Sequence, residues 1–347
     1  MTVCYFGIFD PDYPRNRILL DGLKQNGVEI IMCNSRAKGF KKYSELINRH
    51  KEIKDQYDVM VVGYMGHLIM PLAKVLSRKP IIFDAFLSLY NTMVYDRQVC
   101  SPKSPKAWYY YVLDWLACRL ADHVVIDTQA HIDYFVKTFK AKPKRFSRIW
   151  IGAHDKFYYS GKKSSGRFKV LWWGWMTPLH GIETMLGAAK KLQDKGVQFV
   201  FVGGGKKMKD GKKLQQVQNI SNVEWHEPAQ GDELLKYIHD ADVCLGLFGK
   251  SSKVQLVIPN KIYEAFACQK SVVTARSLAA DEILKDGVHC LFCEVDDGTD
   301  LADKIMMLKN DKQLLEKIAQ NGKELYEQEF NPNALGNQFK HIIENYV

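Results

Sequence analysis

The chain has no long uninterrupted apolar segment. The most apolar candidate, Val59 to Leu76, is broken by Gly63, Gly66, His67 and Lys74, whereas a membrane-spanning helix needs about 20 apolar residues. The N-terminus also lacks a charged leader and a cleavage site, because it begins directly with a strand-like segment. We therefore expect a cytoplasmic protein, either free or attached to the inner face of a membrane without crossing it.

Metal-binding and nucleic-acid-binding patterns are absent as well. The eight cysteines are scattered, and Cys290 and Cys293 form the only close pair, without the second ligand pair that a zinc site needs. Most cysteines lie in apolar runs, where a reduced thiol behaves as a small hydrophobic side chain. No helix-turn-helix, RNA-recognition or zinc-finger spacing occurs. We therefore expect no metal, no cofactor and no nucleic-acid partner.

Positive charge is abundant, with 49 Lys and Arg against 39 Asp and Glu and a formal net charge of +10. The lysines cluster in four stretches, at residues 38–42, 140–145, 162–169 and 206–213. Such clusters are typical of a solvated surface, and they also suit an anionic membrane or a polyphosphate substrate. Charge alone leaves these alternatives open.

Short apolar segments alternate with helical ones along most of the chain. In the first half, strands are expected at 3–9, 29–33, 58–63, 80–84 and 123–127, with helices at 17–26, 68–77 and 107–120. A stretch rich in Gly, Ser and Lys at 151–168 interrupts the pattern. The alternation then resumes, with strands expected at 169–173, 198–202 and 271–275, a turn at the glycines 203–205 and late helices at 301–310, 312–330 and 334–346. This order predicts an α/β protein with two Rossmann-like, doubly wound parallel sheets, whose ligands lie at the carboxyl ends of the strands.

Residues 259–282 carry the most specific pattern. Pro259 and Asn260 predict a turn, followed by a short helix with Glu264, a buried strand and a second helix with Glu282. A helix start gathers unpaired N–H groups and the positive end of the helix dipole, which suits a diphosphate. Lys261 adds a positive charge, and a carboxylate one turn later could accept hydrogen bonds from ribose hydroxyls. The alternative is that Glu264 is an ordinary helix residue of a common α/β unit.

This segment resembles the donor-binding element of family-4 glycosyltransferases, which have the GT-B fold. Glu264-Ala265-Phe266-Ala267 matches the second glutamate of the family's paired-glutamate pattern, and the first glutamate falls at Leu256. The resemblance implies that Glu264 holds the ribose of a nucleotide-sugar donor and that Lys261 binds its phosphates. It also implies that residues 280–282, ending in Glu282, line the sugar site and take part in catalysis.

A second segment, residues 169–183, resembles the family's Val-Gly-Arg-Leu and Lys-Gly element, which brings two cations to the donor diphosphate. Here Trp175 takes the place of the Arg and His180 the place of the Lys. The resemblance implies that amides around Gly174 and the ring of His180 contact phosphates, although a histidine brings a full charge only when it is protonated. A capping or packing role is the alternative for His180.

Asn222-Val-Glu-Trp-His-Glu-Pro-Ala229 resembles the family's Asn-Val-x-Phe-x-Gly-x-Val element. In the family the following loop lies beside the nucleobase, which implies that Glu227, Pro228 and Ala229 contact the base, largely through main-chain atoms. The ordered matches imply a donor-binding domain at 167–330 and an acceptor-side domain at 1–160. They also imply a C-terminal helix, 333–347, that packs back on the first domain.

The N-terminal half resembles the family only in outline. Arg15 and Asn16 lie where a loop enters a helix, so they could bind an anionic group on the acceptor side; a plain surface charge is the alternative for Arg15. Asp84 follows a strand at the place where the family often has a histidine that faces the transferred sugar. It could bind sugar hydroxyls or act as a catalytic acid or base, or it could cap the following turn.

Residues 105–120 are rich in aromatic side chains, and Lys103, Lys106 and Arg119 lie nearby. Such a segment could lie at the headgroup layer of a membrane, or it could be a buried helix.

The resemblance implies a glycosyltransferase that moves a sugar from a nucleoside diphosphate sugar to a hydroxyl acceptor, such as a lipid-linked or surface glycan. The resemblance implies retention of anomeric configuration without a metal. Rival functions are a GT-B sugar-nucleotide epimerase and a non-catalytic protein that binds nucleotide sugars. A third rival, suggested only by charge and aromatic residues, is an RNA-binding protein.

Overall fold

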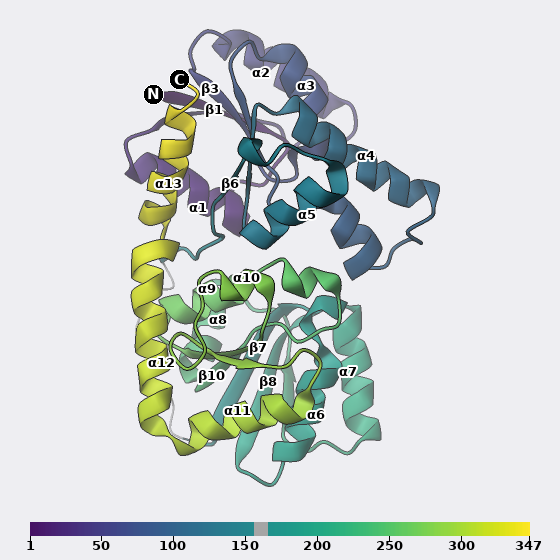
Figure 1. The fold of residues 1–347 in the computed structure, drawn as a ribbon, viewed down its shortest axis with the longest axis vertical. Coiled ribbons are helices and arrows are strands. Elements are labelled where there is room, and N and C mark those ends of the chain that lie inside the picture. Colours follow the sequence, from purple (N-terminus) through teal and green to yellow (C-terminus); the bar gives the residue numbers. More distant parts are fainter. Residues whose placement is uncertain (156–165) are drawn as a thin grey trace. The chain divides into compact units, whose positions relative to one another are not determined.

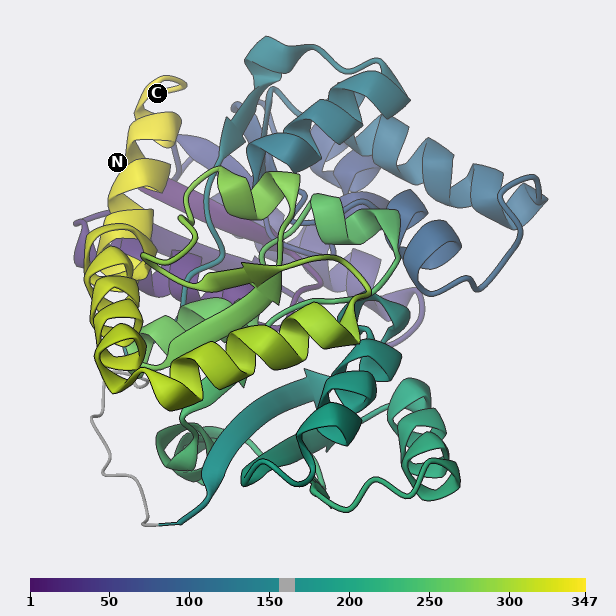
Figure 2. The same ribbon diagram turned by 60° about the horizontal axis from the view of Figure 1, so that its bottom comes forward.

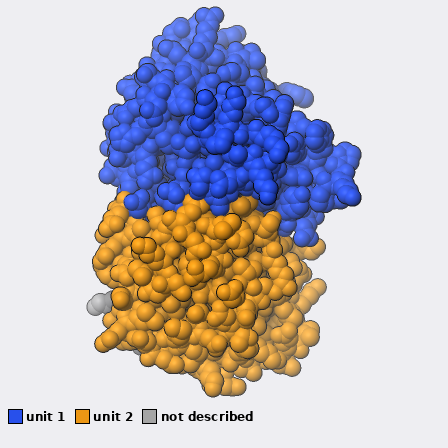
Figure 3. All heavy atoms as spheres, viewed as in Figure 1, with its two compact units in different colours: residues 1–154, 329–347 blue, residues 155–328 orange. Residues whose placement is uncertain are grey.

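The computed structural model describes residues 1–155 and 166–347, and it divides the chain into two compact units (Figures 1 and 3). Unit 1 comprises residues 1–154 and 329–347, and unit 2 comprises residues 155–328. Unit 1 therefore ends earlier than residue 160, and the chain returns to it at 329 rather than 333. Much of the linker expected at 151–168 lies outside the described residues.

Each unit is built on a six-stranded sheet in which all neighbouring strands run parallel. The α/β class with two doubly wound parallel sheets, predicted from the sequence, is thereby confirmed. The central strands are buried on both faces, as parallel sheets require. In spatial order, the sheet of unit 1 consists of β2 (Glu29–Asn34), β1 (Thr2–Gly7), β3 (Val59–Val62), β4 (Ile81–Asp84), β5 (His123–Ile126) and β6 (Phe146–Arg148). The sheet of unit 2 consists of β12 (Leu291–Cys293), β11 (Ser271–Ala275), β10 (Val243–Leu245), β7 (Phe168–Trp175), β8 (Val197–Gly204) and β9 (Val223–His226).

The last helix of the chain belongs to unit 1, where it packs against the first helix (Figure 1). The two helices approach closely at Gly22 and Gly336, since a methyl group added at Gly22 would lie 2.9 Å from the Cα of Gly336. Asn26 Nδ2 also donates to the Asn333 carbonyl at 2.9 Å. The helices of unit 1 are α1 (Pro14–Gln25), α2 (Lys41–Ile53), α3 (Met70–Leu76), α4 (Pro105–Leu120), α5 (Gln129–Phe139) and α13 (Pro332–Glu344).

The helices of unit 2 cover both faces of its sheet. Figure 2 shows α6 and α11 side by side, and they pack directly on each other. Residues from both join β7 and β8 in one apolar core, including Met185, Ile305, Trp172 and Phe201. The helices of unit 2 are α6 (Ile182–Leu192), α7 (Lys206–Val217), α8 (Gly231–Asp240), α9 (Asn260–Ala267), α10 (Leu278–Asp281), α11 (Gly298–Asn310) and α12 (Lys312–Leu325).

Three helices were not expected from the sequence. The segments of α2 and α7 contain lysine clusters, and each helix buries only two residues, so neither carries a wide apolar stripe. α5 buries His131, Ile132, Phe135 and Phe139 in a helical spacing that the sequence analysis did not recognise. Among the residues that the structure describes, no helix combines the length and the apolar character needed to cross a membrane.

Candidate functional site

The strand order of unit 2 reverses at β7. The strands that follow β7 in the sequence, β8 and β9, lie on one side of it, and β10, β11 and β12 lie on the other. Such a switch point leaves a crevice outside the carboxyl ends of the strands, where open α/β sheets bind ligands. The predicted donor-binding residues lie in the last part of β7 or in the segments that follow β7, β9 and β10: Gly174, Trp175, His180, Glu227, Pro228, Ala229, Lys261 and Glu264.

Glu264 is held at this switch point. It lies one turn into α9, and its Oε2 accepts a hydrogen bond of 2.7 Å from Nε1 of Trp173 in β7. Pro259 precedes the helix and provides no side-chain cap for its first amides. The start of α9 and the Glu264 carboxylate therefore meet at the carboxyl end of β7.

Lys261 is a buried cation in the first turn of α9. Its side chain and backbone are only 7% exposed, and Nζ lies 4.8 Å from the ring centroid of Trp172. Burial lowers the pKa of Lys261 from 10.5 to about 7, although the charge of Glu264 opposes that fall. The ammonium form is therefore poorly stabilised by the protein itself, and an anionic ligand would stabilise it.

His180 is a neutral donor rather than a cation. Its Nδ1 accepts a 3.0 Å hydrogen bond from the Thr177 amide, so Nε2 carries the proton of the neutral ring. Burial and the positive charges of Lys261 and Lys253 hold the pKa of His180 well below its ordinary value. The capping role that the sequence left open is present, and any contact of His180 with phosphate would come from its Nε2–H.

Lys253 is a second buried lysine that the sequence analysis missed. It lies in a 3-10 turn, Ser252–Gln255, after β10 and is 8% exposed. No sequence pattern indicated its burial, because a lysine that follows Lys250, Ser251 and Ser252 is typical of a solvated loop. Leu256, which replaces the family's first glutamate, is buried as well.

Near the carboxyl ends of β7 and β8, Gly174 lies directly opposite Gly203 in the sheet. A methyl group added at Gly203 would lie 1.9 Å from the Gly174 carbonyl oxygen, so no larger residue fits there without displacing the strand. Around Gly174, by contrast, no described residue other than its two chain neighbours has an atom within 4 Å of the position that a methyl group would take. The backbone at Gly174 is therefore open to a ligand.

The remaining predicted residues of unit 2 lie at the same edge of the sheet. Glu227 and Pro228 are exposed in the loop after β9, and Ala229 is partly exposed. Glu282 directly follows the four-residue helix α10 instead of lying within a helix, and it is partly exposed. The neighbouring Asp281 forms an ion pair of 3.3 Å with Arg276.

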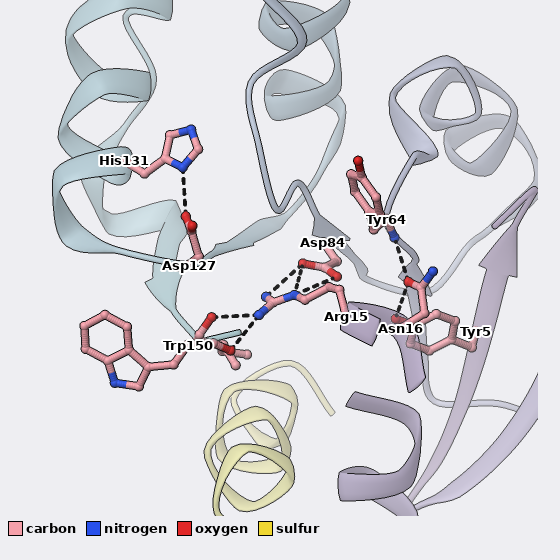
Figure 4. Close-up of polar contacts among 9 residues, drawn as sticks. Tyr5, Arg15, Asn16, Tyr64, Asp84, Asp127, His131 and Trp150 are labelled. Carbon is pink, nitrogen blue, oxygen red and sulfur yellow. Dashed lines mark hydrogen bonds and ion pairs between the residues drawn. The ribbon is translucent and has the colours of Figure 1, made fainter. Parts of the chain in front are cut away.

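In unit 1, Arg15 and Asp84 form an internal ion pair (Figure 4). Arg15 Nη2 lies 3.0 Å from Asp84 Oδ1, and Nη1 donates to the carbonyls of Ile149 at 2.8 Å and Trp150 at 2.7 Å. Both charged residues are completely buried. Burial raises the pKa of Asp84, while the Arg15 guanidinium opposes that rise. Arg15 is thus not a surface charge, and in this conformation neither residue is accessible to a sugar or an anion.

Asn16 is also internal. Its Oδ1 accepts a hydrogen bond of 3.2 Å from the Tyr64 amide, and its Nδ2 donates to the Asp10 carbonyl at 2.9 Å. Since Asn16 lies in the first turn of α1 and Tyr64 follows β3, this contact joins the segments at the switch point between β1 and β3.

Two further buried polar clusters in unit 1 were missed from the sequence. Asp127 and His131 lie at the carboxyl end of β5, with Oδ1 and Nδ1 2.8 Å apart (Figure 4). Asp114 of α4 accepts hydrogen bonds from Ser88 Oγ at 2.6 Å and from the Tyr90 amide at 2.9 Å. The residues in contact are up to 26 positions apart in the sequence, and no motif in the sequence links them. Within the described ranges, no three His, Cys, Asp or Glu side chains are grouped so that they could hold a metal ion.

Known proteins share this sequence pattern and this fold. Residues 167–311 match the family model described as glycosyl transferases group 1. An uncharacterized glycosyltransferase of Methanocaldococcus jannaschii is 27% identical over 184 residues, which is 51% of this chain. The match covers 47% of that protein, so this chain aligns with about half the length of its curated relative.

Two solved structures resemble the chain over nearly its full length. HepE of Anabaena, in complex with UDP-glucose, has a TM-score of 0.72 and 16% identity, with 99% of this chain and 100% of that chain covered. Sucrose-phosphate synthase of Thermosynechococcus elongatus has a TM-score of 0.74 and 16% identity, with 99% and 98% covered. At such low identity the likeness establishes the fold. The GT-B fold predicted from the sequence is confirmed, and the similarity to the glycosyl transferases group 1 model lies within unit 2 of that fold.

Proposed function

We propose that the protein is a glycosyltransferase that transfers a sugar from a nucleoside diphosphate sugar to a hydroxyl acceptor. The observation that carries the proposal is that Lys261 and Glu264 both lie in the first two turns of α9, beside the switch point of the unit 2 sheet. A cation and uncapped helix amides suit a diphosphate, and a carboxylate one turn later suits ribose hydroxyls. The relatives and the UDP-glucose complex of HepE support a nucleotide sugar as the donor.

In this proposal the donor lies along the carboxyl edge of the unit 2 sheet. Glu264 binds the ribose, and Lys261, the His180 Nε2–H and the amides near Gly174 bind the phosphates. Glu282 lines the sugar site. During transfer the bond from the anomeric carbon to the diphosphate breaks and the bond to the acceptor oxygen forms. The proton of the acceptor hydroxyl passes to an oxygen of the leaving diphosphate. Lys261 and the helix amides stabilise the charge that develops on the leaving diphosphate. The new bond retains the anomeric configuration.

The acceptor side is assigned to unit 1, where Asp84, Arg15 and Asn16 shape the carboxyl edge of its sheet. Because Arg15 and Asp84 are buried and bonded to each other, they position the backbone of Ile149 and Trp150 in this conformation. A direct role of Asp84 in acid–base chemistry requires that this pair opens when the acceptor binds.

The donor assignment is tested by ligand-dependent thermal stability and calorimetry with UDP, GDP, ADP and CDP. A ligand that binds only the folded state raises the melting temperature, so at least one nucleoside diphosphate should do so. The matching nucleotide sugar should then release nucleoside diphosphate when acceptor extracts are added, and NMR of the product shows whether the configuration is retained. If none of the four nucleotides binds, the proposal fails.

The same experiment separates the rival functions. An epimerase would convert the donor sugar without any acceptor, so the altered free donor would appear with no transfer product. A non-catalytic binding protein would bind the nucleotide sugar tightly, with no turnover in any acceptor extract. Transfer of label from donor to acceptor excludes both.

We further propose that the acceptor is lipid-linked and that unit 1 attaches to an anionic membrane. Figure 1 shows the beginning of α4 projecting from the rest of unit 1. Exposed apolar or aromatic residues and exposed lysines gather there: Tyr95, Val99, Lys103, Lys106, Trp108 and Tyr109. At the opposite end of α4, a hollow of about 220 Å³ is lined by four cations and no acidic residue: Arg119, Lys140, Lys142 and Arg145. Aromatic side chains beside basic ones suit the interfacial layer of anionic lipids.

Co-sedimentation with liposomes tests the attachment. The protein should pellet with vesicles that contain phosphatidylglycerol at low salt, and less so at high salt, because screening weakens surface attraction. Neutral vesicles should retain less protein. A Trp108→Ser, Tyr109→Ser variant should lose attachment, whereas Val217→Ser, which removes an exposed apolar residue of α7 in unit 2, should not. Protein that stays in the supernatant with anionic vesicles at low salt would favour a soluble acceptor.

A further inference from the structure

Trp175 is an unusually exposed tryptophan at the carboxyl edge of the unit 2 sheet. It is the last residue of β7, and 67% of its surface is accessible to solvent. Tryptophan carries a large apolar ring and is highly buried on average in folded proteins. In contrast, Trp172 and Trp173 of the same strand are buried. The exposed indole of Trp175 is therefore not a core side chain.

The indole of Trp175 lies over two glycines of the neighbouring strand. In the register of the sheet, Trp175 is opposite Gly204. A methyl group added at Gly204 would lie 3.0 Å from Cζ3 of Trp175, and one added at Gly205 would lie 3.4 Å from Cε2. These atoms belong to different sides of the six-membered ring, so the ring extends across the backbone of both glycines. Because residues 204 and 205 have no side chains, the ring can pack directly on their backbone.

Pro228 lies at the same place. The methyl position at Gly204 is also 3.4 Å from Cγ of Pro228, so the proline ring and the indole share Gly204 as a neighbour. Pro228 is exposed in the loop after β9. Trp175 and Pro228 together thus form an exposed, apolar and rigid surface above the carboxyl ends of β8 and β9.

We propose that Trp175 is a stacking platform for the nucleobase of the donor. This inference rests on the proposed function and assigns one of its contacts. The strand order is β10, β7, β8, β9, with Glu264 bonded to Trp173 on β7 and the Trp175 ring directed over β8. A ribose held by Glu264 therefore has its attached base directed toward the indole, while the phosphates extend toward Lys261. A nucleobase presents a flat π-surface, and aromatic side chains bind such surfaces by stacking.

This assignment changes the role predicted for position 175. The resemblance placed Trp175 where the family has a phosphate-binding arginine, yet an indole has no positive charge and only one N–H donor. Lys261 and Lys253, both buried near His180, carry the positive charge at this site instead. The residue at 175 is then available to bind the base.

Two variants and two ligands test the proposal. Trp175→Ala should weaken binding of the preferred nucleoside diphosphate by roughly 5- to 150-fold, the range for loss of one base–aromatic stack. Its affinity for inorganic pyrophosphate, which has no base, should stay at the wild-type value. Trp175→Phe keeps an aromatic ring and should retain most of the nucleotide affinity. Phe40→Ala removes an exposed aromatic residue of unit 1 and serves as the matched control, with no change for either ligand.

The outcomes separate stacking from other roles. If Trp175 only covers Gly204, then Trp175→Ala lowers the melting temperature and leaves the ratio of nucleotide to pyrophosphate affinity unchanged, which overturns the proposal. An equal loss for both ligands would show a phosphate-side role and would also overturn it. A loss that appears only with the sugar attached would assign the ring to the sugar instead. If the wild-type protein binds pyrophosphate but none of the nucleotides, the proposed function fails together with the stacking role.

Discussion

Replacing Lys261 with methionine should stabilise the free protein and weaken its binding of nucleotide. Lys261 is buried in the first turn of α9, with its ammonium near the face of Trp172. Methionine has a similar length and no charge, and its sulfur packs favourably on aromatic rings. The substitution therefore removes the buried charge while it keeps most of the packing.

The size of the effect follows from the pKa of Lys261, which burial lowers from 10.5 to about 7. Between these values the unfolded chain binds more protons than the folded protein, so the free energy of unfolding rises with pH. At ~1.36 kcal/mol per unit of pKa, the ammonium destabilises the folded state by up to about 5 kcal/mol at low pH. The free energy of unfolding of the wild type should therefore rise by about 2 kcal/mol between pH 7 and pH 9, as the folded protein loses this ammonium proton.

Urea denaturation of the wild type and of Lys261→Met at pH 7 and pH 9 measures this difference. The variant should be more stable at pH 7 and should lack the rise in stability toward pH 9. Lys312→Met is the matched control, because its side chain on α12 is 84% exposed; it should change neither quantity. Calorimetry should show that Lys261→Met binds nucleoside diphosphate about 10- to 150-fold more weakly, because a hydrogen bond to a charged group contributes ~1.5–3 kcal/mol.

The wild-type affinity should also fall between pH 7.5 and pH 9, since the ammonium form is the one that binds the diphosphate. The phosphate itself is fully ionised across that range, with its last pKa near ~6, so the change reports on the protein. A Lys261→Met variant that is less stable than wild type at pH 7 would refute the argument about the buried charge. A variant with unchanged nucleotide affinity would refute the argument about the ligand.

Three other substitutions test single contacts. Glu264→Ala should weaken nucleotide binding by ~1.5–3 kcal/mol in calorimetry, while Glu264→Gln, which can still accept from Trp173 Nε1, should keep the wild-type melting temperature. In thermal denaturation, Gly203→Ala should destabilise unit 2 by about 1–3 kcal/mol or more, because the added methyl group would lie 1.9 Å from the Gly174 carbonyl oxygen. The control Gly187→Ala should be tolerated, because α6 has space for a methyl group at that position. Asp114→Asn should lower the free energy of unfolding in urea by about 1–3 kcal/mol. The asparagine NH2 group would take the place of the carboxylate oxygen that accepts hydrogen bonds from Ser88 Oγ and the Tyr90 amide.

The sequence predicted the fold best where local pattern and tertiary environment agree. The β-branched run Ser271–Ala275 is β11 with the same bounds, because a strand buried on both faces is continuously apolar. β8 extends two residues past the expected Val202, to Gly204. Its glycines were read as a turn, whereas they pair with Gly174 and Trp175 and leave room for the indole. A glycine that serves a neighbouring strand is indistinguishable in the sequence from one that serves a turn.

The candidate site of unit 2 could be predicted because its residues follow strands of one sheet. Parallel strands bring the segments after β7, β9 and β10 to one edge, so the positions of Lys261 and Glu264 followed from their places after strands. The contacts in unit 1 could not be predicted in this way. Arg15 and Asp84 are 69 residues apart, and each was given a ligand-binding role separately, because nothing in the sequence shows that one neutralises the other.

Arg15 and Lys261 are both buried cations, but they differ in the partners that the fold provides for them, and this difference indicates their roles. Arg15 has a carboxylate and two backbone carbonyls as partners, so its charge is compensated within unit 1. Removing one member of such a pair typically costs about 3–5 kcal/mol, and Arg15→Met should destabilise the protein accordingly. Lys261 has the face of Trp172 and the charge of Glu264, which is itself bonded to Trp173. We therefore expect Arg15→Met to lower the free energy of unfolding and Lys261→Met to raise it. That result would identify Arg15 as structural and Lys261 as a cation kept for an anionic ligand. Equal destabilisation by the two substitutions would show instead that the fold alone needs both charges.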